Sequence, residues 1–227
     1  MKLLKNEWLQ WLILAAPLAA AALLWDRLPA LLPIHWNIHG RIDGYAGKRF
    51  VVLVFPCLNL ALAVLLALLP RWDRRCREYD AETKASIAGV FKVCRLGMSA
   101  FFSAMAVAIF LAGLKYHFDM GRFLVAGAGL LFAVMGNSMA KLRPNSFAGF
   151  RTPWTFASRT VWMKTHRLGG WLMVGCGLAL FVESLLLPFQ WCLFTGVLPM
   201  VVLVGIVPMA YSYFSLQAEK KTSPAAH

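Results

Sequence analysis

Six long apolar runs, separated by polar and turn-rich segments, constrain the fold of this chain more than any other feature. Each run holds 18 or more residues. They are Trp8–Trp25, Phe50–Leu69, Leu96–Leu114, Phe123–Ala140, Leu168–Leu187 and Trp191–Phe214. A helix needs roughly 20 residues to cross ~30 Å of hydrocarbon. We therefore predict an all-α integral membrane protein with six transmembrane helices.

The composition agrees with a membrane protein. The chain is 60% hydrophobic and 15% charged, whereas a soluble domain carries about 25% charged residues. The first run follows Lys2 and Lys5 and has the look of a signal peptide. Its length, and Trp8 and Trp25 at its ends, favour a helix that is retained.

The chain has a net charge of +13, and its basic residues alternate between rich and poor segments along the sequence. Of the 23 basic residues, 17 lie before the first run, in 70–95, in 141–167 and in the tail; six lie in 26–49 and 115–122. The positive-inside rule places the larger group in the cytoplasm, so the prediction is N-in and C-in. The excess then reflects topology and attraction to the lipid bilayer, and we predict no direct contact with nucleic acid.

Three parts of the chain can be distinguished. Residues 1–70 hold the first two spans and a cap loop, 26–49; residues 71–95 form a basic cytoplasmic loop; residues 96–227 hold four spans. Arginines at the start of 71–95 favour a helical extension that reaches lipid phosphates. The five cysteines show no CxxC spacing, so neither a disulfide framework nor a thiolate metal site is predicted. No phosphate-binding glycine loop occurs, and we expect no cofactor.

The external loop, 26–49, is rich in proline and glycine, which predicts a compact cap rather than a long helix. Residues 34–39 favour a short extended piece closed by a turn at Gly40. His35, His39 and Asp43 are spaced by four, and would form a metal set only on a helix. The alternative is that these polar groups bond the turn backbone. The candidate binding residues of the cap are His35, Asn37, Asp43 and Lys48.

The cytoplasmic loop, 141–167, predicts an amphipathic helix at the membrane interface. Thr152 and Pro153 are a helix-start signal, with threonine as N-cap and proline at the first position. Trp154 and Trp162 then fall on one face and should pack inward, against the spans that begin at Leu168 and end at Ala140. We also expect nearby carbonyls or asparagines to hold the guanidinium of Arg151.

Residues that can make directed bonds are unusually dense in and beside this loop. The candidate binding residues are Asn137, Asn145, Arg151, Thr152, Trp154, Thr155, Arg159, Trp162, Thr165, His166 and Arg167. Within the spans, Asn59 and Glu183 are expensive to bury unless partnered. We expect Asn59 to bridge helices, and Glu183 to face the bundle with Arg41, Lys48 or a cap histidine nearby, or to be protonated.

The segment 137–170 resembles the signature of the SdpI family of bacterial membrane immunity proteins. The resemblance rests on Asn137, Lys141, Pro144-Asn145, Gly149 to Thr155, Trp162, Thr165 to Arg167 and Gly169. The cap, with Pro33 to Asn37, Gly40, Asp43 to Tyr45 and Lys48, is similar to the N-terminal domain of unknown function that many members carry. His39 is not part of that pattern.

The resemblance implies a multi-pass protein of the bacterial cytoplasmic (inner) membrane. It implies resistance to a secreted peptide toxin outside, and binding of a cytoplasmic regulator such as a transcriptional repressor. Two other classes remain open from the residues: a small-molecule or ion transporter using Asn59 and Glu183, and a membrane enzyme with His166 as base. No nucleophile–base–carboxylate set occurs, and no acid lies between Ala140 and Trp171, so we predict a protein that is not an enzyme.

Overall fold

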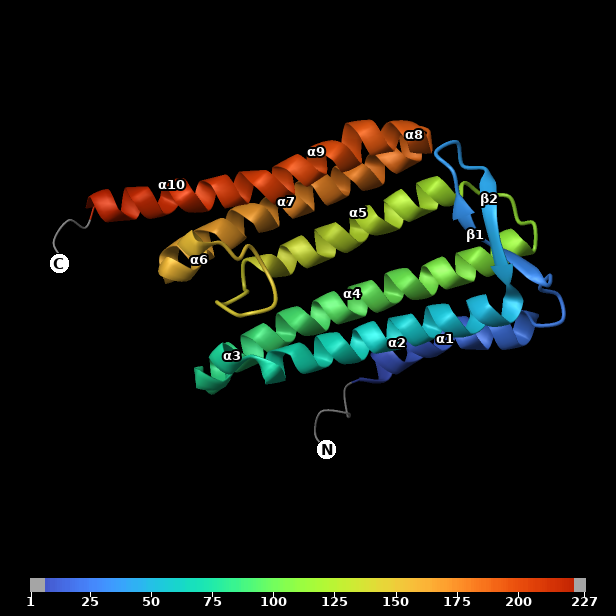
Figure 1. Ribbon diagram of the computed structural model, residues 1–227, viewed down its shortest axis with the longest axis horizontal. Coiled ribbons are helices and arrows are strands. Elements are labelled where there is room, and N and C mark those ends of the chain that lie inside the picture. Colours follow the sequence, from blue (N-terminus) through green and yellow to red (C-terminus); the bar gives the residue numbers. More distant parts are fainter. Residues whose placement is uncertain (1–6, 223–227) are drawn as a thin grey trace.

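The computed structural model describes residues 7–222 and is an elongated bundle of helices (Figure 1). Its main helices are α1 (Trp8–Leu24), α2 (Lys48–Trp72), α4 (Ala81–Gly113), α5 (Met120–Met139), α7 (Arg159–Leu186) and the helical run Phe189–Thr222. Five of these helices in the described chain are long and apolar enough to cross a membrane. The sixth, α1, is apolar but has 17 residues. The prediction of a helical membrane protein is confirmed. Residues 1–6 and 223–227 lie outside the described part of the chain, and the predicted cytoplasmic location of the two termini applies to them.

The bundle has two groups of three helices: α1, α2 and α4 lie together, and so do α5, α7 and the last helix (Figure 1). Glycines let α5 and α7 approach until their backbones touch. A Cβ on Gly136 would lie 2.8 Å from the carbonyl oxygen of Gly170, and one on Gly129 would lie 2.6 Å from that of Gly177. Small residues commonly permit such close helix packing within membranes.

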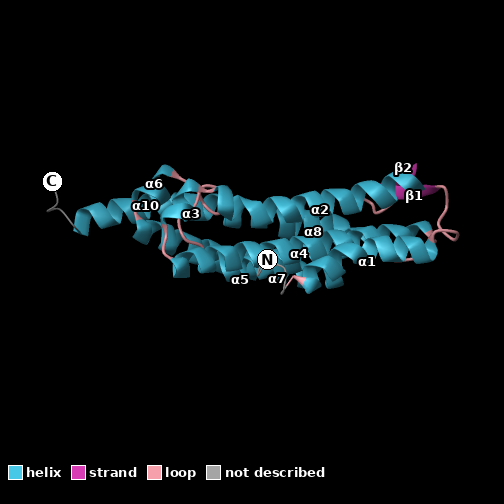
Figure 2. Ribbon diagram, turned by 90° about the horizontal axis from the view of Figure 1, so that it is seen from below, coloured by secondary structure: helices cyan, strands magenta, loops and turns pink. Residues whose placement is uncertain are grey.

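The cap loop forms a β-hairpin. A strand in part of the predicted extended piece and the turn at Gly40 are present, but pairing with a second strand was not predicted. Strands β1 (Leu31–Trp36) and β2 (Ile42–Gly47) pair antiparallel, with Leu31 opposite Gly47 and Pro33 opposite Tyr45. Leu32 is fully buried, and its side chain lies where a Cβ on Gly113 of α4 would stand. The strands lie at one end of the bundle, the hairpin end, and α3 and α6 lie at the other (Figure 2). We call that other end, with residues 141–158, the motif end.

Residues 71–95 are mostly helical, as expected for an extension of the membrane helices. Asp73 caps the short helix α3 (Arg74–Glu78), and Asp80 caps α4 through the N–H of Thr83. Helix α4 has 33 residues and is therefore about 50 Å long. Helix α1 begins only part-way along it, where Glu7 forms an ion pair with Arg95.

The last helical run is not a regular α-helix. It comprises α8 (Phe189–Cys192), η1 (Leu193–Val197), α9 (Leu198–Met200), η2 (Val201–Ile206) and α10 (Val207–Thr222), where η marks π-helix. Pro199 and Pro208 each follow a π segment. Because proline has no N–H to donate and its ring crowds the preceding turn, a π turn before it relieves the helix locally.

The predicted amphipathic interfacial helix is wrong in its extent. Helix α6 (Pro153–Ala157) has five residues, and α7 then begins at Arg159, nine residues before the apolar run. Ser158 separates the two with an extended backbone, and its hydroxyl accepts the N–H of Val161. Because Ser158 starts a new helix there, residues 159–167 extend a membrane helix instead of lying along the membrane surface.

Candidate functional site

The segment 141–152 folds back over the motif end, and Asn145 shapes its first turn. The Asn145 side chain is buried and makes four hydrogen bonds. Its oxygen accepts the N–H groups of Phe147 and Ala148, and its NH₂ donates to the carbonyls of Arg143 and Ala148. An asparagine that satisfies its neighbours' backbone groups in this way fixes a turn, so Asn145 acts on the shape of the segment.

Asp73 ties this segment to the other half of the bundle. Its carboxylate accepts the Ser146 N–H at 2.6 Å, the Ser146 hydroxyl at 2.9 Å and the Arg75 N–H at 2.9 Å. Burial acts to raise the pKa of Asp73, but these hydrogen bonds outweigh it and hold the pKa below 3.8. Burial, together with the charged carboxylate of Asp73, raises the pKa of Cys76 to about 12, so that thiol is not a nucleophile at neutral pH.

His166 holds the second half of the segment from inside the bundle. The imidazole is fully buried; Nε2 accepts the Phe150 N–H at 3.0 Å, and Nδ1 lies 2.8 Å from the Trp162 carbonyl. A ring that accepts at Nε2 and donates at Nδ1 is neutral. Gly149, at φ +100°, passes so close that a Cβ there would stand 2.1 Å from Nε2. The imidazole is thus a packing and bonding group with both nitrogens occupied.

Trp162 completes the interior of the motif end. It is fully buried, stacks on His166 with ring centroids 4.1 Å apart, and donates its indole N–H to the Leu142 carbonyl at 2.8 Å. Leu142 and Trp162 pack in one apolar cluster with Ile87 and Phe91 of α4. The inward packing predicted for Trp162 is confirmed, and it connects the segment to α4.

Two contacts fasten the motif end to the last helix. Thr152 and Thr155 form a reciprocal capping box at the start of α6, which confirms the predicted N-cap. The Thr152 hydroxyl lies 3.0 Å from the hydroxyl of Ser212 in α10. Ser158 donates to the carboxylate of Glu219, also in α10. Thr165 is buried too, with no hydrogen-bond partner for its hydroxyl among the described residues.

The other predicted residues of the motif lie on the surface. Arg151, Arg159, Arg167 and Asn137 are exposed. The expectation that carbonyls clamp Arg151 is not met, because its guanidinium makes no hydrogen bond within residues 7–222. Trp154 is half-buried and meets Tyr213 of α10 edge-on at 5.2 Å, rather than the helices predicted for it. The motif therefore divides into a buried frame and an exposed basic surface.

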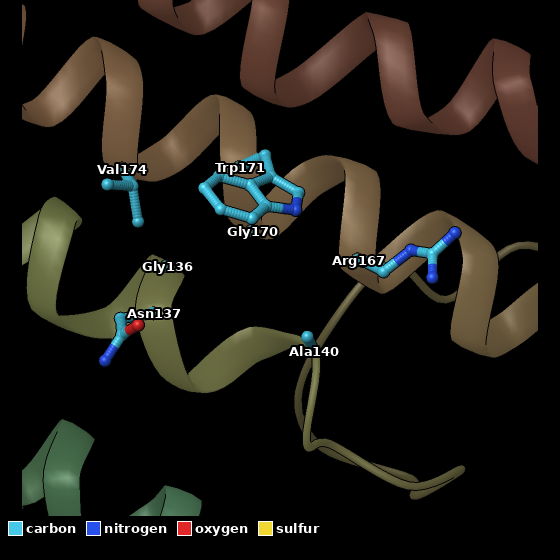
Figure 3. A pocket seen from close by; sticks show the side chains of 7 residues that line it. All are labelled: Gly136, Asn137, Ala140, Arg167, Gly170, Trp171 and Val174. Carbon is cyan, nitrogen blue, oxygen red and sulfur yellow. The ribbon is translucent and has the colours of Figure 1, made fainter.

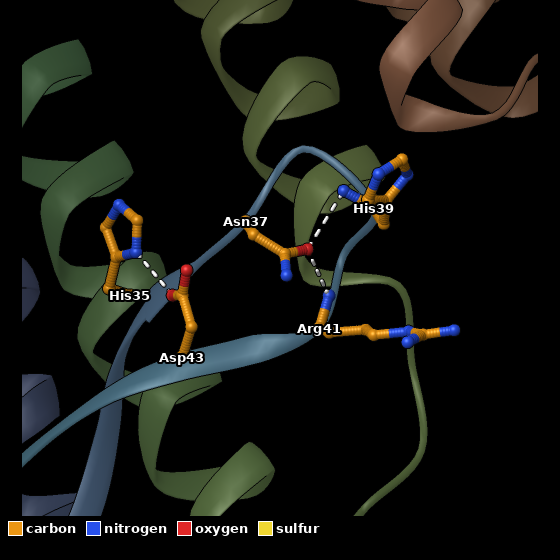
Figure 4. A network of polar contacts seen from close by, with 5 residues as sticks. All are labelled: His35, Asn37, His39, Arg41 and Asp43. Atoms are coloured by element: carbon orange, nitrogen blue, oxygen red, sulfur yellow. Dashed lines mark hydrogen bonds and ion pairs between the residues drawn. The ribbon is translucent and has the colours of Figure 1, made fainter.

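At the hairpin end, polar residues of the cap make two kinds of contact: an ion pair between the strands and hydrogen bonds that close the turn. His35 and Asp43 face each other from opposite strands, with Nδ1 and Oδ1 2.5 Å apart (Figure 4). The Asn37 oxygen accepts the N–H groups of His39 and Arg41 and so closes the turn. The His39 side chain lies at that turn, away from the pair, and no group of three metal-ligating side chains assembles in the described chain. The three-residue metal set is therefore not brought together.

Lys48 is a structural residue of this end. Its ammonium donates to the carbonyls of Trp25 and Leu28 at 2.9 and 3.1 Å and lies over the Trp25 ring. These bonds cap the carbonyls at the end of α1 from the first residue of α2. Lys48 is thus bonded to backbone carbonyls and not to Glu183.

The two polar residues within the spans differ in their surroundings. The Asn59 amide donates to the Ser99 carbonyl and the Ser103 hydroxyl of α4, which confirms that it bridges helices. Glu183 is half-buried and accepts a hydrogen bond from Thr195 of η1 at 3.2 Å. No hydrogen bond or ion pair joins it to its predicted partners, Arg41, Lys48 and the cap histidines, within residues 7–222.

Sequence reasoning missed several residues that hold these sites together. Asp73 had a signal, since it is an isolated acid among arginines at the end of an apolar run. The others are polar residues of helices, and nothing in the sequence shows which neighbouring element each one faces. They are Gln10, which donates to Ser99, and Ser212 and Glu219 of α10.

Comparisons of the sequence with known proteins find two family matches and one curated relative. Residues 141–212 match the SdpI/YfhL protein family, and residues 12–60 match a domain of unknown function, DUF1648. The chain is 23% identical over 211 residues to the immunity protein SdpI of Bacillus subtilis (strain 168). The aligned region covers 93% of this chain and 97% of that protein. No solved structure shows significant similarity to the chain.

Proposed function

Since this chain belongs to the SdpI/YfhL protein family, we propose that it is a membrane immunity protein that gives resistance to a secreted toxin or peptide. In this proposal the hairpin end lies outside the bacterial cytoplasmic membrane and meets the toxin. The motif end lies inside and binds a cytoplasmic regulator protein. The distribution of basic residues supports that orientation.

The observation that carries the proposal is that α4 extends from the motif end to the hairpin end and packs against both. Near its end, Ile109 and Phe110 pack in one apolar cluster with Leu32 of the hairpin. Near its start, Ile87 and Phe91 pack with Trp162 of the motif. One continuous helix therefore contacts both candidate binding regions. A shift of α4 caused by a ligand at one end would change packing at the other, which is a physical requirement for coupled binding.

At each end, different residues would make the contacts. The exposed His35 and Asp43 are available to a peptide outside, while Asn37 and Lys48 shape the surface. Arg151 and Arg159 are available to an acidic partner inside. Buried Asn145, Thr155, Thr165 and His166 position the segment that presents them.

The contacts favour this role over the two alternatives. A catalytic base must be able to take a proton from a substrate, whereas both nitrogens of His166 are bonded to the protein backbone. For a transporter, Asn59 would line a path, whereas its amide is used between α2 and α4. We accordingly propose a binding role without catalysis.

The deciding experiment measures protection and insertion separately. The chain is expressed in a bacterial host that lacks it, and survival is measured against a panel of membrane-active bacterial peptides. We expect protection against at least one peptide.

Replacing Arg151 and Arg159 with alanine should abolish protection without lowering the amount of the protein in the membrane, because both side chains are exposed. The matched control replaces Arg71 and Arg74, which are also exposed at the motif end. Equal loss in both double variants would refute a specific role for the motif.

Orientation is tested by cysteine labelling in a cysteine-free background. We expect Arg41→Cys, in the hairpin, to react with an impermeant reagent in intact cells, and Lys141→Cys to react only after lysis. Both side chains are exposed, so burial does not limit labelling. The reverse pattern would place the motif outside and refute the proposed partner.

A further inference from the structure

A groove of about 290 Å³ runs between α5 and α7 at the motif end (Figure 3). Its floor is the close contact of Gly136 with Gly170, where neither residue has a side chain to fill the space. Its walls carry three larger groups, Asn137, Trp171 and Arg167. The groove is the place where two tightly packed helices leave room for another molecule.

The polar groups of this groove have no partner among the described residues. Neither the Asn137 amide nor the Arg167 guanidinium makes a hydrogen bond or ion pair with any residue in 7–222. No acidic residue occurs between Ala140 and Trp171. An arginine without a carboxylate nearby is available to an anion, and its planar fork matches the oxygens of a phosphate.

Polarity falls steadily along the groove. Arg167, Trp171 and Val174 follow one another at helical spacing on one face of α7, and so span about 10 Å of its length. Arg167 immediately precedes the apolar run that starts at Leu168. Trp171 is 72% exposed on the side of the bundle, as expected for an indole at the boundary between headgroups and hydrocarbon. Val174 lies one turn deeper.

We propose that this groove binds an anionic phospholipid. The Arg167 guanidinium holds the phosphate, the Asn137 amide bonds the glycerol ester region, and an acyl chain lies along Trp171 and Val174 over the Gly136–Gly170 contact. The order of charged, amphipathic and apolar groups matches the order of chemical groups in a lipid that enters from the side. Basic pockets between transmembrane helices commonly bind lipid headgroups in this way.

The test uses the full chain, purified in detergent, with native mass spectrometry as the readout. Phosphatidylglycerol or phosphatidylcholine is titrated in, and the lipid retained per protein is counted. We expect phosphatidylglycerol to be retained preferentially. Arg167→Gln should weaken its retention about tenfold, the effect of losing one charge-assisted hydrogen bond. Arg71→Gln is the matched control, since Arg71 is an exposed arginine at the same end but on α2; it should retain the lipid.

A second measurement locates the acyl chain. In vesicles that contain phosphatidylglycerol with brominated chains, tryptophan fluorescence should be quenched. The difference between the wild-type chain and Trp171→Phe isolates the contribution of Trp171. That contribution should fall in the Arg167→Gln variant and persist in Arg71→Gln.

Three results would overturn the proposal. Equal retention of the two lipids would indicate ordinary lipid around the bundle. Equal losses in the two arginine variants would indicate general attraction to negative charge. Displacement of the lipid by soluble glycerol phosphate would indicate a site for a free anion instead.

Discussion

Asp73 accepts both the backbone N–H and the hydroxyl of Ser146, a residue 73 positions later in the chain. The first belongs to the end of α2 and the second to the segment that covers the motif end. This single buried carboxylate therefore joins the two halves of the bundle at one end. Its loss would leave two donors of Ser146 without an acceptor.

Asp73→Ala should lower the free energy of unfolding by about 1–3 kcal/mol, the range for leaving buried hydrogen-bonding groups unpaired. Thermal unfolding in detergent measures the effect. Glu78→Ala is the control, because Glu78 is an exposed acid five residues away. Equal melting temperatures for the two variants would show that the contact does not stabilise the fold.

The same carboxylate should make stability depend on acid pH. Its pKa is below 3.8 in the folded chain because of its hydrogen bonds. Its contribution is therefore fully present well above 3.8, the unfolded pKa, and is lost as the pH falls through the lower folded pKa. The difference in melting temperature between the wild-type chain and Asp73→Asn should be constant above about pH 5 and should shrink below pH 3.8. A difference that grows on acidification would contradict the assignment.

His166→Phe keeps a ring in the buried space but removes both hydrogen bonds. We expect the segment around Phe150 to loosen, because its N–H loses its acceptor. Limited digestion with trypsin should then cut after Arg151 more quickly than in the wild-type chain. His39→Phe, in the hairpin turn, is the control and should leave the cutting rate unchanged.

The seat of the hairpin on α4 can be tested with two glycines of that helix. A Cβ on Gly113 would stand 2.4 Å from Leu32, whereas one on Gly89 meets nothing within 4 Å. Gly113→Ala should destabilise the chain by about 1–3 kcal/mol through overpacking. Gly89→Ala should stabilise it by up to about 1 kcal/mol, since alanine favours helix. Melting temperatures that move in the same direction would refute this account of the contact.

Arg151→Lys should leave the melting temperature unchanged within the error of the measurement, since the guanidinium makes no bond that depends on its fork shape. A clear loss of stability would show that the side chain is clamped after all. Charge reversal by Arg151→Glu should instead reduce survival in the protection assay, because it would weaken binding of the proposed acidic partner.

The sequence predicted local features well because they depend on neighbours in the chain. Thr152 and Pro153 start a helix through backbone groups only three residues away. The hydrogen bonds of Asn59 to another helix were predictable because lipid offers its amide no hydrogen-bond partner. The pairing of Asp73 with Ser146 was not predictable, since it depends on how α2 and the motif segment meet in space.

The second strand of the hairpin and the break at Ser158 were missed for a related reason. The strands are short, and proline and glycine within them obscure the alternation that indicates a strand. The spacing of apolar residues after Pro153 fits a helix on either side of Ser158. Only the extended backbone at that residue ends α6 and starts α7, the helix that carries Trp162 and His166 into the core.

The π segment η2 has a consequence for the rotational phase of the last helix. Each residue of an α-helix advances the direction of the side chains by about 100°, and a π turn accommodates one additional residue. If Val201–Ile206 formed a regular α-helix with the same number of residues, everything beyond it would be rotated about the helix axis by roughly the 100° of one residue. Ser212 would then turn away from Thr152, and Glu219 from Ser158, although no contact residue had been changed. The insertion thus sets the angular alignment by which the last helix fits the motif.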